Sequence, residues 1–254
     1  MIVKTASMFL LFTALLWGLS LNSAGSQATS KGFLDIETGW VFPGYCDVQI
    51  PGDSGTRFSL TNDLSTSGSL FIRLRAGYRF NPRHSVFVLF APLSLDGSGS
   101  VDQPVDFNGV TFPALTPFES LYRFNSYRLT YRYGLKESEK LRIGIGLTAK
   151  IRDAAIRLRG DGLESEKTNV GFVPLLHFLL DWRLTSAWRF LLEGDAAAAS
   201  QGRAEDAFIG FVYLAGEKWS LRAGYRILEG GADVQEVYNF SLLNYFAVGA
   251  SFHF

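Results

Sequence analysis

Residues 70–80 read LFIRLRAGYRF, and apolar and polar side chains alternate along the whole stretch. Successive side chains of a β-strand point to opposite faces of the sheet. The alternation therefore predicts a strand with one apolar face and one basic face. The apolar face holds Leu70, Ile72, Leu74, Ala76, Tyr78 and Phe80, and the other holds Arg73, Arg75, Gly77 and Arg79.

The same period of two recurs at residues 127–135, 141–152, 172–184 and 219–227. A soluble β-sandwich alternates as well, but its strands are usually about 5–6 residues long. These segments run for about 9–13 residues, the length of strands that cross a membrane. Their polar faces place arginine beside glycine, which suits the inside of a narrow barrel. We therefore predict an all-β fold, a transmembrane antiparallel up-and-down β-barrel.

The connections between the segments support this fold. Short turns at 81–84, 136–140, 185–187 and 216–218 alternate with longer segments at 43–68, 97–121, 153–170, 199–205 and 229–241. Short periplasmic turns and long outer loops are typical of transmembrane barrels. We predict about ten strands, with eight or twelve as alternatives: 32–42, 69–80, 85–96, 122–135, 141–152, 171–184, 188–198, 206–215, 219–228 and 242–254.

Aromatic residues cluster at the short-turn ends of these strands, on the apolar face. Amphipathic rings prefer the interface between lipid and water. The pattern predicts a periplasmic girdle of Tyr78, Phe80, Tyr131, Tyr133, Trp182, Trp188 and Trp219, with Trp40 and Phe42 in the outer girdle.

The N-terminus has the organisation of a secretory signal. Lys4 is followed by an apolar run from Met8 to Leu19 and then by small residues. A membrane-anchoring helix is the alternative, but about 20 apolar residues are needed to span a bilayer. We predict a signal peptide at 1–28, cleaved near residues 26–28, and a barrel domain at 29–254.

Aromatic and aliphatic residues also alternate at the C-terminus, which ends on phenylalanine. This ending resembles the C-terminal signature of bacterial outer-membrane barrel proteins. The resemblance is to the general architecture, and no specific functional family is matched. It implies a location in the outer membrane of a Gram-negative bacterium, contact with outer-membrane lipid and lipopolysaccharide, and recognition by periplasmic chaperones and the barrel assembly machinery. The residues that carry it are Phe246, Val248, Phe252 and Phe254.

Composition excludes some partners and cofactors. Removing Lys4 with the signal leaves 23 of the 24 basic residues against 24 acidic ones, and nucleic-acid binding needs a clear basic excess. The single cysteine, Cys46, is interpreted as a loop thiol rather than an acylation site. No His, Cys or Asp cluster has metal-ligand spacing, and we expect no metal or other cofactor.

The inward faces of the predicted strands carry most of the charge. Acidic candidates include Asp35 and Glu37, with Asp96 near the outer rim. The predicted lumenal network comprises Arg73, Arg75, Arg128, Lys150, Arg152, His177, Asp181, Glu193, Asp195 and Arg226. A basic ring is predicted at the periplasmic mouth, from Arg79, Arg132, Arg142, Arg183, Arg189 and Arg222.

Three classes of function fit this lumen. Interlocked ion pairs would make it a structural core; a basic excess would make it a small, anion-preferring pore. An enzyme would need a nucleophile or carboxylates beside a histidine, and His177 is the inward-facing candidate. We predict a non-enzymatic protein of structural or small-solute pore character. The alternatives are an outer-membrane lipid hydrolase or acyl-modifying enzyme, and a surface binding or adhesion protein acting through its outer loops.

The loop sequences carry further expectations. The Asn108-Gly109 pair predicts a hairpin over residues 105–112, which would extend the third and fourth strands as a ribbon above the membrane. Residues 44–64 are predicted to form the largest outer loop. Ala154 and Ala155 interrupt the alternation and predict a bulge. Two acidic clusters, at 161–166 and 229–236, are candidates for divalent cations, with solvated loops as the simpler interpretation.

Overall fold

The structure is a computed structural model that describes residues 30–254. The predicted signal peptide, residues 1–28, therefore lies outside the described residues. From residue 30 onward no helix is long and apolar enough to cross a membrane. The secondary structure there consists of β1 Gly32–Gln49, β2 Phe58–Ser59, β3 Ser69–Asn81, β4 His84–Ala91, β5 Ser94–Gly99, β6 Val105–Phe107, β7 Val110–Phe112, β8 Phe118–Glu137, β9 Leu141–Gly160, β10 Leu163–Arg183, β11 Trp188–Ala199, β12 Gly202–Leu214, β13 Trp219–Val234 and β14 Val237–His253.

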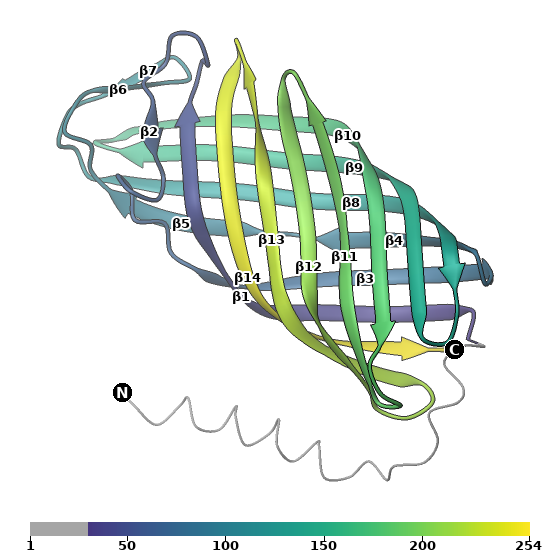
Figure 1. Ribbon diagram of the computed structural model, residues 1–254. Helices are drawn as coiled ribbons and strands as arrows, with labels where there is room; N and C mark the ends of the chain where they lie inside the picture. The colour runs from purple at the N-terminus through teal and green to yellow at the C-terminus, as the bar shows by residue number, and fades with distance from the viewer. Residues whose placement is uncertain (1–29) are drawn as a thin grey trace, which may run out of the picture.

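These strands form a closed antiparallel barrel. Each barrel strand pairs with its neighbours in the chain, and β14 pairs with β1 to complete the circle (Figure 1). Its ten strands are β1, β3, β4, and β8 to β14, with β5 continuing β4 along β8 after a break at Pro92 and Leu93. The predicted all-β, up-and-down barrel is confirmed, as is the count of ten strands.

The alternation of side chains fixes which face of each strand meets lipid. Outward residues such as Leu70, Leu147, Leu176 and Phe246 are 60–67 % exposed, and their neighbours in the chain point into the lumen. The apolar band ends on β8 and β9, where the outward residues become Asn125 and Asp153, joined by a hydrogen bond of 3.0 Å. Outward of Asn125 and Asp153, β8 and β9 extend beyond the apolar band.

Three of the predicted outer loops are strand extensions instead. Residues 153–170 continue β9 and β10 to a turn at Asp161-Gly162, and 229–241 continue β13 and β14 to a turn at Gln235-Glu236. Residues 199–205 contain only a two-residue turn between β11 and β12. Both turn residues at 161 and 162 have positive φ, of 52° and 72°. An Asp-Gly pair adopts this conformation readily, which allows the strands to reverse in a tight hairpin.

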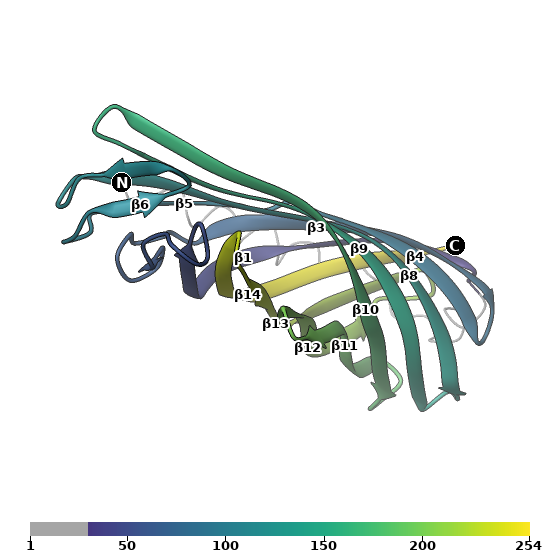
Figure 2. The same ribbon diagram turned by 90° about the horizontal axis from the view of Figure 1, so that it is seen from above.

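The remaining outer segments fold over the mouth of the barrel. The predicted hairpin exists as β6 and β7, with positive φ at Asn108 and Gly109. It does not extend its flanking strands as a ribbon, however. It is a separate two-stranded sheet that lies with β2 at the end of the barrel away from the C-terminus (Figures 1 and 2).

Apolar burial explains why these segments fold inward. We call the segments at residues 50–68 and 100–117 the cap. Phe107 and Phe112 are completely buried, and Phe112 packs edge-on against Phe118 of β8 at 5.3 Å between ring centroids. The fully buried members of the cap are Ile50, Leu60, Leu64, Val105, Phe107 and Phe112. The predicted loop at 44–64 is thus partly β1 and partly this apolar layer.

Two smaller expectations also differ from the structure. The register of β9 against both neighbours is continuous through Ala154 and Ala155, so no bulge lies there. Bulges occur instead at Pro43/Tyr45, Arg79/Asn81 and Gly134/Lys136. Cys46 is not in a loop: it lies in β1 with its thiol buried, and burial raises the pKa of this thiol to about 12.

Candidate functional site

The centre of the lumen is filled by an ion-pair network around Asp206 and Glu37. Asp206 on β12 forms ion pairs with Arg73 at 2.9 Å, Arg128 at 2.6 Å and Arg226 at 2.5 Å. Glu37 on β1 binds Arg73 at 3.4 Å and both Arg222 and Arg226 at 2.8 Å. Shared arginines therefore link strands on opposite sides of the barrel.

Four further lumenal carboxylates are held in the same way. Each lies within 4.0 Å of at least two basic side chains, so none depends on a single partner. The pairs are Asp35 with Arg222 and Arg75, Glu193 with Arg75, Arg132 and His177, Asp195 with Arg128 and His177, and Asp181 with Arg142 and Arg189.

Aromatic rings fill the space between the charged groups. Phe208 is buried in the lumen, with the guanidinium carbons of Arg222 and Arg226 5.8 and 5.3 Å from its ring centroid. The ring has room because Gly210 and Gly224 face each other across β12 and β13. A Cβ atom at either position would lie within 2.8 Å of the ring. Such stacking satisfies the faces of guanidinium groups that carboxylates do not reach.

Most of the predicted network residues lie together. Arg73, Arg75, Arg128, His177, Glu193, Asp195 and Arg226 belong to the ion-paired centre, whereas Asp181 pairs with Arg142 and Arg189 at the periplasmic mouth. Lys150 and Arg152 lie on the same inward face of β9 but nearer the outer end, beside a pocket rather than in the network.

The predicted basic ring is less uniform than expected. Arg79, Arg132, Arg142, Arg189 and Arg222 line one cavity at the periplasmic mouth, together with Asp181 and Glu193. Arg183 lies apart and donates to the backbone oxygens of Thr185 and Ser186 at 3.2 Å. Arg222 reaches inward to Asp35 and Glu37 and thus belongs to the central network as well.

The sequence interpretation missed Asp206, which binds three arginines. We placed it at the start of a strand without assigning the face on which it lies. A usable signal exists, because Ile209 and Phe211 are the outward apolar residues of β12. Counting back from them by twos leaves Asp206 on the inward face.

His177 is a buried member of the network. Its Nδ1 lies 3.0 Å from Asp195, and its Nε2 lies 3.8 Å from Glu193. The nearby Thr148 hydroxyl donates to Asp195 at 2.7 Å rather than to the histidine. A histidine that acts as base for a nucleophile must bind the hydroxyl itself. This geometry is that of a histidine held by two carboxylates.

The candidate cation clusters at the outer rim are occupied by arginines. Arg203 contacts Glu229 at 2.7 Å, and Tyr45 donates its hydroxyl to the same carboxylate. Partial burial would raise the pKa of Glu229, but the bonds from Arg203 and Tyr45 hold it below the usual value. Glu164 lies 3.9 Å from Arg157 and 3.8 Å from Arg159. Between residues 30 and 254 no group of three or more His, Cys, Asp or Glu could hold a metal ion.

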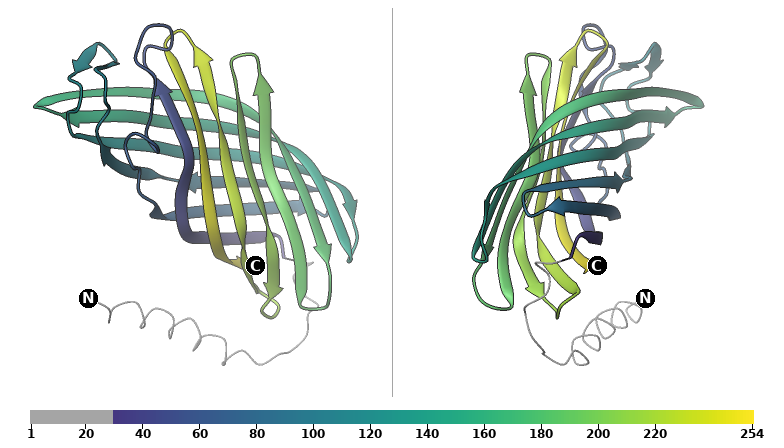
Figure 3. Two further views of the ribbon diagram at one scale, coloured as in Figure 1. Left: turned by 60° about the vertical axis from the view of Figure 1, so that its left-hand side comes forward. Right: turned by 90° about the vertical axis from the view of Figure 1, so that its right-hand side faces the viewer.

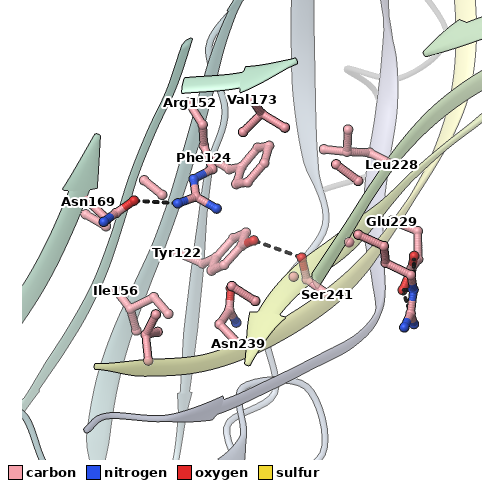
Figure 4. A pocket seen from close by; sticks show the side chains of 18 of the residues that line it. Tyr122, Phe124, Arg152, Ile156, Asn169, Val173, Leu228, Glu229, Asn239 and Ser241 are labelled. Carbon is pink, nitrogen blue, oxygen red and sulfur yellow. Dashed lines mark hydrogen bonds and ion pairs between the residues drawn. The ribbon is translucent and has the colours of Figure 1, made fainter. Parts of the chain in front are cut away.

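A pocket lies in the outer half of the lumen, between the network and the cap (Figure 4). Its walls come from β8, β9 and β10 on one side and from β12, β13 and β14 on the other. Tyr122 and Ser241 join the two sides by a hydrogen bond of 2.9 Å between their hydroxyls. Small inward residues on β12 and β13, Ala204, Gly230 and Ala232, leave this space unfilled.

Closed antiparallel strands with an apolar outer band and a charged interior define the chain as having the fold of a bacterial outer-membrane β-barrel. It is similar to the outer-membrane protease OmpT of Escherichia coli, with a TM-score of 0.56 and 8 % identity over 91 % of this chain and 100 % of that one. It also matches the translocator domain of the autotransporter NalP from Neisseria meningitidis, with a TM-score of 0.43, 17 % identity and coverage of 98 % and 96 %. No protein-family model and no curated protein matches the sequence. The similarity to the protease shows the fold alone.

Proposed function

We propose that the protein is a non-enzymatic barrel of the Gram-negative outer membrane whose lumen is a closed structural core. The observation that carries the proposal is the double or triple pairing of the six lumenal carboxylates described above with arginines and His177. A solute moving through the lumen would have to break several buried ion pairs at once. Breaking one buried pair costs about 3–5 kcal/mol.

The cap supports the same proposal from the outer end. Its buried phenylalanines and leucines lie across the mouth through which a solute would enter. Opening this end would expose several large apolar side chains to water, and each buried side chain contributes about 1.5–3 kcal/mol. The small-solute pore is therefore the less favoured of the two roles that the sequence predicted.

The proposal also assigns no catalysis to the lumen. His177 is 4 % exposed, and the carboxylates that it contacts are already bound by arginines. A substrate has no path to this histidine that leaves the network intact. An activated nucleophile within reach of a histidine base would be needed for a hydrolase, and Thr148 binds Asp195 instead.

Export and assembly complete the proposal. Outer-membrane lipid and lipopolysaccharide would contact the apolar band. Periplasmic chaperones and the assembly machinery would bind the last strand before it pairs. Phe254 follows the last residue of that strand, and its backbone oxygen accepts hydrogen bonds from Lys31 and Gly32 at 3.0 and 2.8 Å where the barrel closes.

Single-channel recording in a planar bilayer tests the closed lumen. The mature protein is refolded in detergent, its insertion is verified by protease protection, and current is recorded in a potassium chloride gradient. We expect no discrete steps. Stable anion-selective steps that change with Arg226→Glu, but not with Lys140→Glu in a periplasmic turn, would show an open basic pore and overturn the proposal.

A further inference from the structure

The outer pocket borders an interruption in the wall of the barrel. β11 pairs with β10 only between Arg183↔Arg189 and Leu176↔Ala196. Beyond this point β11 ends at Ala199, whereas β10 continues outward to Leu163 with β9 as its partner. The lining of the pocket accordingly passes from Val173 on β10 to Ala204 on β12 without a residue of β11.

The sequence of β10 is suited to an unpaired edge at this height. Pro174 lies two residues outward of Leu176, the last residue of β10 that pairs with β11, and proline has no N–H to offer a neighbouring strand. Phe172 and Val170 point outward here and are 64 % and 71 % exposed. Val170 pairs with Asp153, which marks the outer limit of the apolar band. The interruption, visible as the diverging outer ends of β10 and β11 in Figure 3, thus opens at the level of the outer leaflet.

The pocket also contains basic groups without acidic partners. Lys150 is 3 % exposed, and no carboxylate of residues 30–254 lies within 4.0 Å of its Nζ. The Nζ atom instead lies 4.8 Å from the centroid of the Phe124 ring. Burying an ammonium group without a counter-ion is costly. Lys150 therefore lacks a counter-ion within the described part of the chain, whereas the carboxylates at the centre of the lumen are already bound by arginines.

Two more basic side chains without a carboxylate partner between residues 30 and 254 line the same pocket, whereas Arg203 and Glu229, which also line it, are paired with each other. Arg152 donates to Asn169 across β9 and β10, and its Nε has no partner among the described residues (Figure 4). Lys167 lies on β10, two residues further toward the outer end than Asn169. The rest of the wall is largely apolar, with Phe124, Ile156, Val173 and Leu228. A basic floor under apolar walls matches a ligand with an anionic head and a hydrocarbon chain.

We propose that this pocket binds a long-chain fatty acid, with its carboxylate at Lys150 and Arg152 and its chain leaving between β10 and the outer end of β11 into the outer leaflet. The depth of Lys150 favours a carboxylate over a lipid phosphate. Lys150 on β9 pairs with Val173 on β10, below the outer limit of the apolar band. A singly charged, compact head is less costly to desolvate there than a phosphate. The inference rests on the proposed function, because lateral entry requires the barrel wall to face lipid.

Binding of palmitate labelled with ¹³C at the carboxyl carbon tests the proposal. The full mature protein in non-ionic detergent is titrated, and the bound carboxyl resonance is followed by NMR. We expect Lys150→Met, which keeps the aliphatic stem, to weaken binding at least about tenfold, the loss of one charged hydrogen bond. The matched control Lys140→Met, in an exposed turn, should bind as the wild type does. Equal affinity of folded Lys150→Met and wild type would overturn the inference.

A second variant and two competitors sharpen the test. Ala204→Trp fills the pocket but keeps Lys150, and we expect it to lose palmitate as well. Hexadecanol, which has the chain but no charge, should compete poorly. Competition by 1-palmitoyl lysophosphatidate stronger than that by palmitate would overturn the choice of a carboxylate head. If the protein does not bind palmitate and also shows no channel steps, only this inference is contradicted. If it binds palmitate but shows channel steps, only the closed lumen is contradicted.

Discussion

Asp206 links three arginines that come from three different strands, β3, β8 and β13. Its carboxylate is 2 % exposed, so it compensates charges that water cannot reach. Arginine suits this arrangement because its planar group binds two carboxylates at once while stacking on Phe208 or Phe87. The charges of the lumen therefore act as cross-links between strands that are distant in sequence.

Replacing Asp206 leaves Arg73, Arg128 and Arg226 with one fewer carboxylate. We expect Asp206→Ala to lower the free energy of unfolding by about 3–5 kcal/mol, because a buried pair broken from one side leaves uncompensated charge. Urea unfolding in detergent micelles, followed by tryptophan fluorescence, measures the loss. Glu205→Ala, one residue away on the exposed face, should change it by less than about 0.5 kcal/mol. Equal losses in the two variants would contradict the network.

Glu229 at the outer rim gives a pH-dependent prediction. Its folded pKa is below the usual 4.5, so its contribution to stability is complete above about pH 4.5. That contribution is lost as the pH falls through the folded pKa. The stability difference between wild type and Glu229→Gln should therefore shrink between pH 7 and pH 3. The two urea midpoints at each pH measure it, and a difference that grows on acidification would contradict the assignment.

The strands themselves were predictable, because lipid on one side and charge on the other impose a strict period of two. All ten predicted strands exist, and their inner ends match the structure to within two residues. Most outer ends lie further out than predicted, as at Gly160 of β9 and Leu163 of β10, because above the lipid neither face of these two strands must be apolar. Asp161-Gly162 was a hairpin signal that could have located that end of both strands.

The cap was not predictable by the same means. Phe58 and Phe107 lie 6.2 Å apart between ring centroids, yet 49 residues separate them in the chain. No periodicity records a contact of this kind. The local Asn108-Gly109 turn could be identified, but the direction in which its hairpin folds depends on distant leucines and phenylalanines.

Phe107 tests whether the cap is held by burial. We expect Phe107→Ala to undock β6 and β7, because truncating a fully buried phenylalanine costs about 3–5 kcal/mol. Trypsin cleavage after Arg57, in the cap, should accelerate at least tenfold, while the barrel keeps its heat-dependent mobility in gel electrophoresis. Thr111→Ala on the exposed side of the same hairpin is the control. Unchanged cleavage in Phe107→Ala would contradict the packed cap.

The whole molecule is a closed cylinder in three layers. A basic vestibule lies at the periplasmic mouth, an ion-paired centre follows, and a pocket beneath the apolar cap completes the outer half. The inward charges could be read from the sequence, but their partners could not, since pairing requires the register across the barrel. Lys150 shows the difference. Its inward direction was predicted from the alternation. That it lacks a carboxylate partner among residues 30–254 is visible only in the structure, where the nearby Asp195 and Asp206 bind Arg128 instead.

The closed centre is tested most directly by the access of water-borne reagents to Thr130. This residue is 1 % exposed in mid-lumen, where its hydroxyl lies 2.8 Å from that of Thr148. In a Cys46→Ser background, Thr130→Cys is exposed to a charged, membrane-impermeant thiol reagent, with Ser138→Cys in a periplasmic turn as the accessible control. We predict that Thr130→Cys stays unmodified in the folded barrel and reacts fully after unfolding in urea. Modification of the folded barrel at the rate of Ser138→Cys would show a water-filled passage and contradict the account.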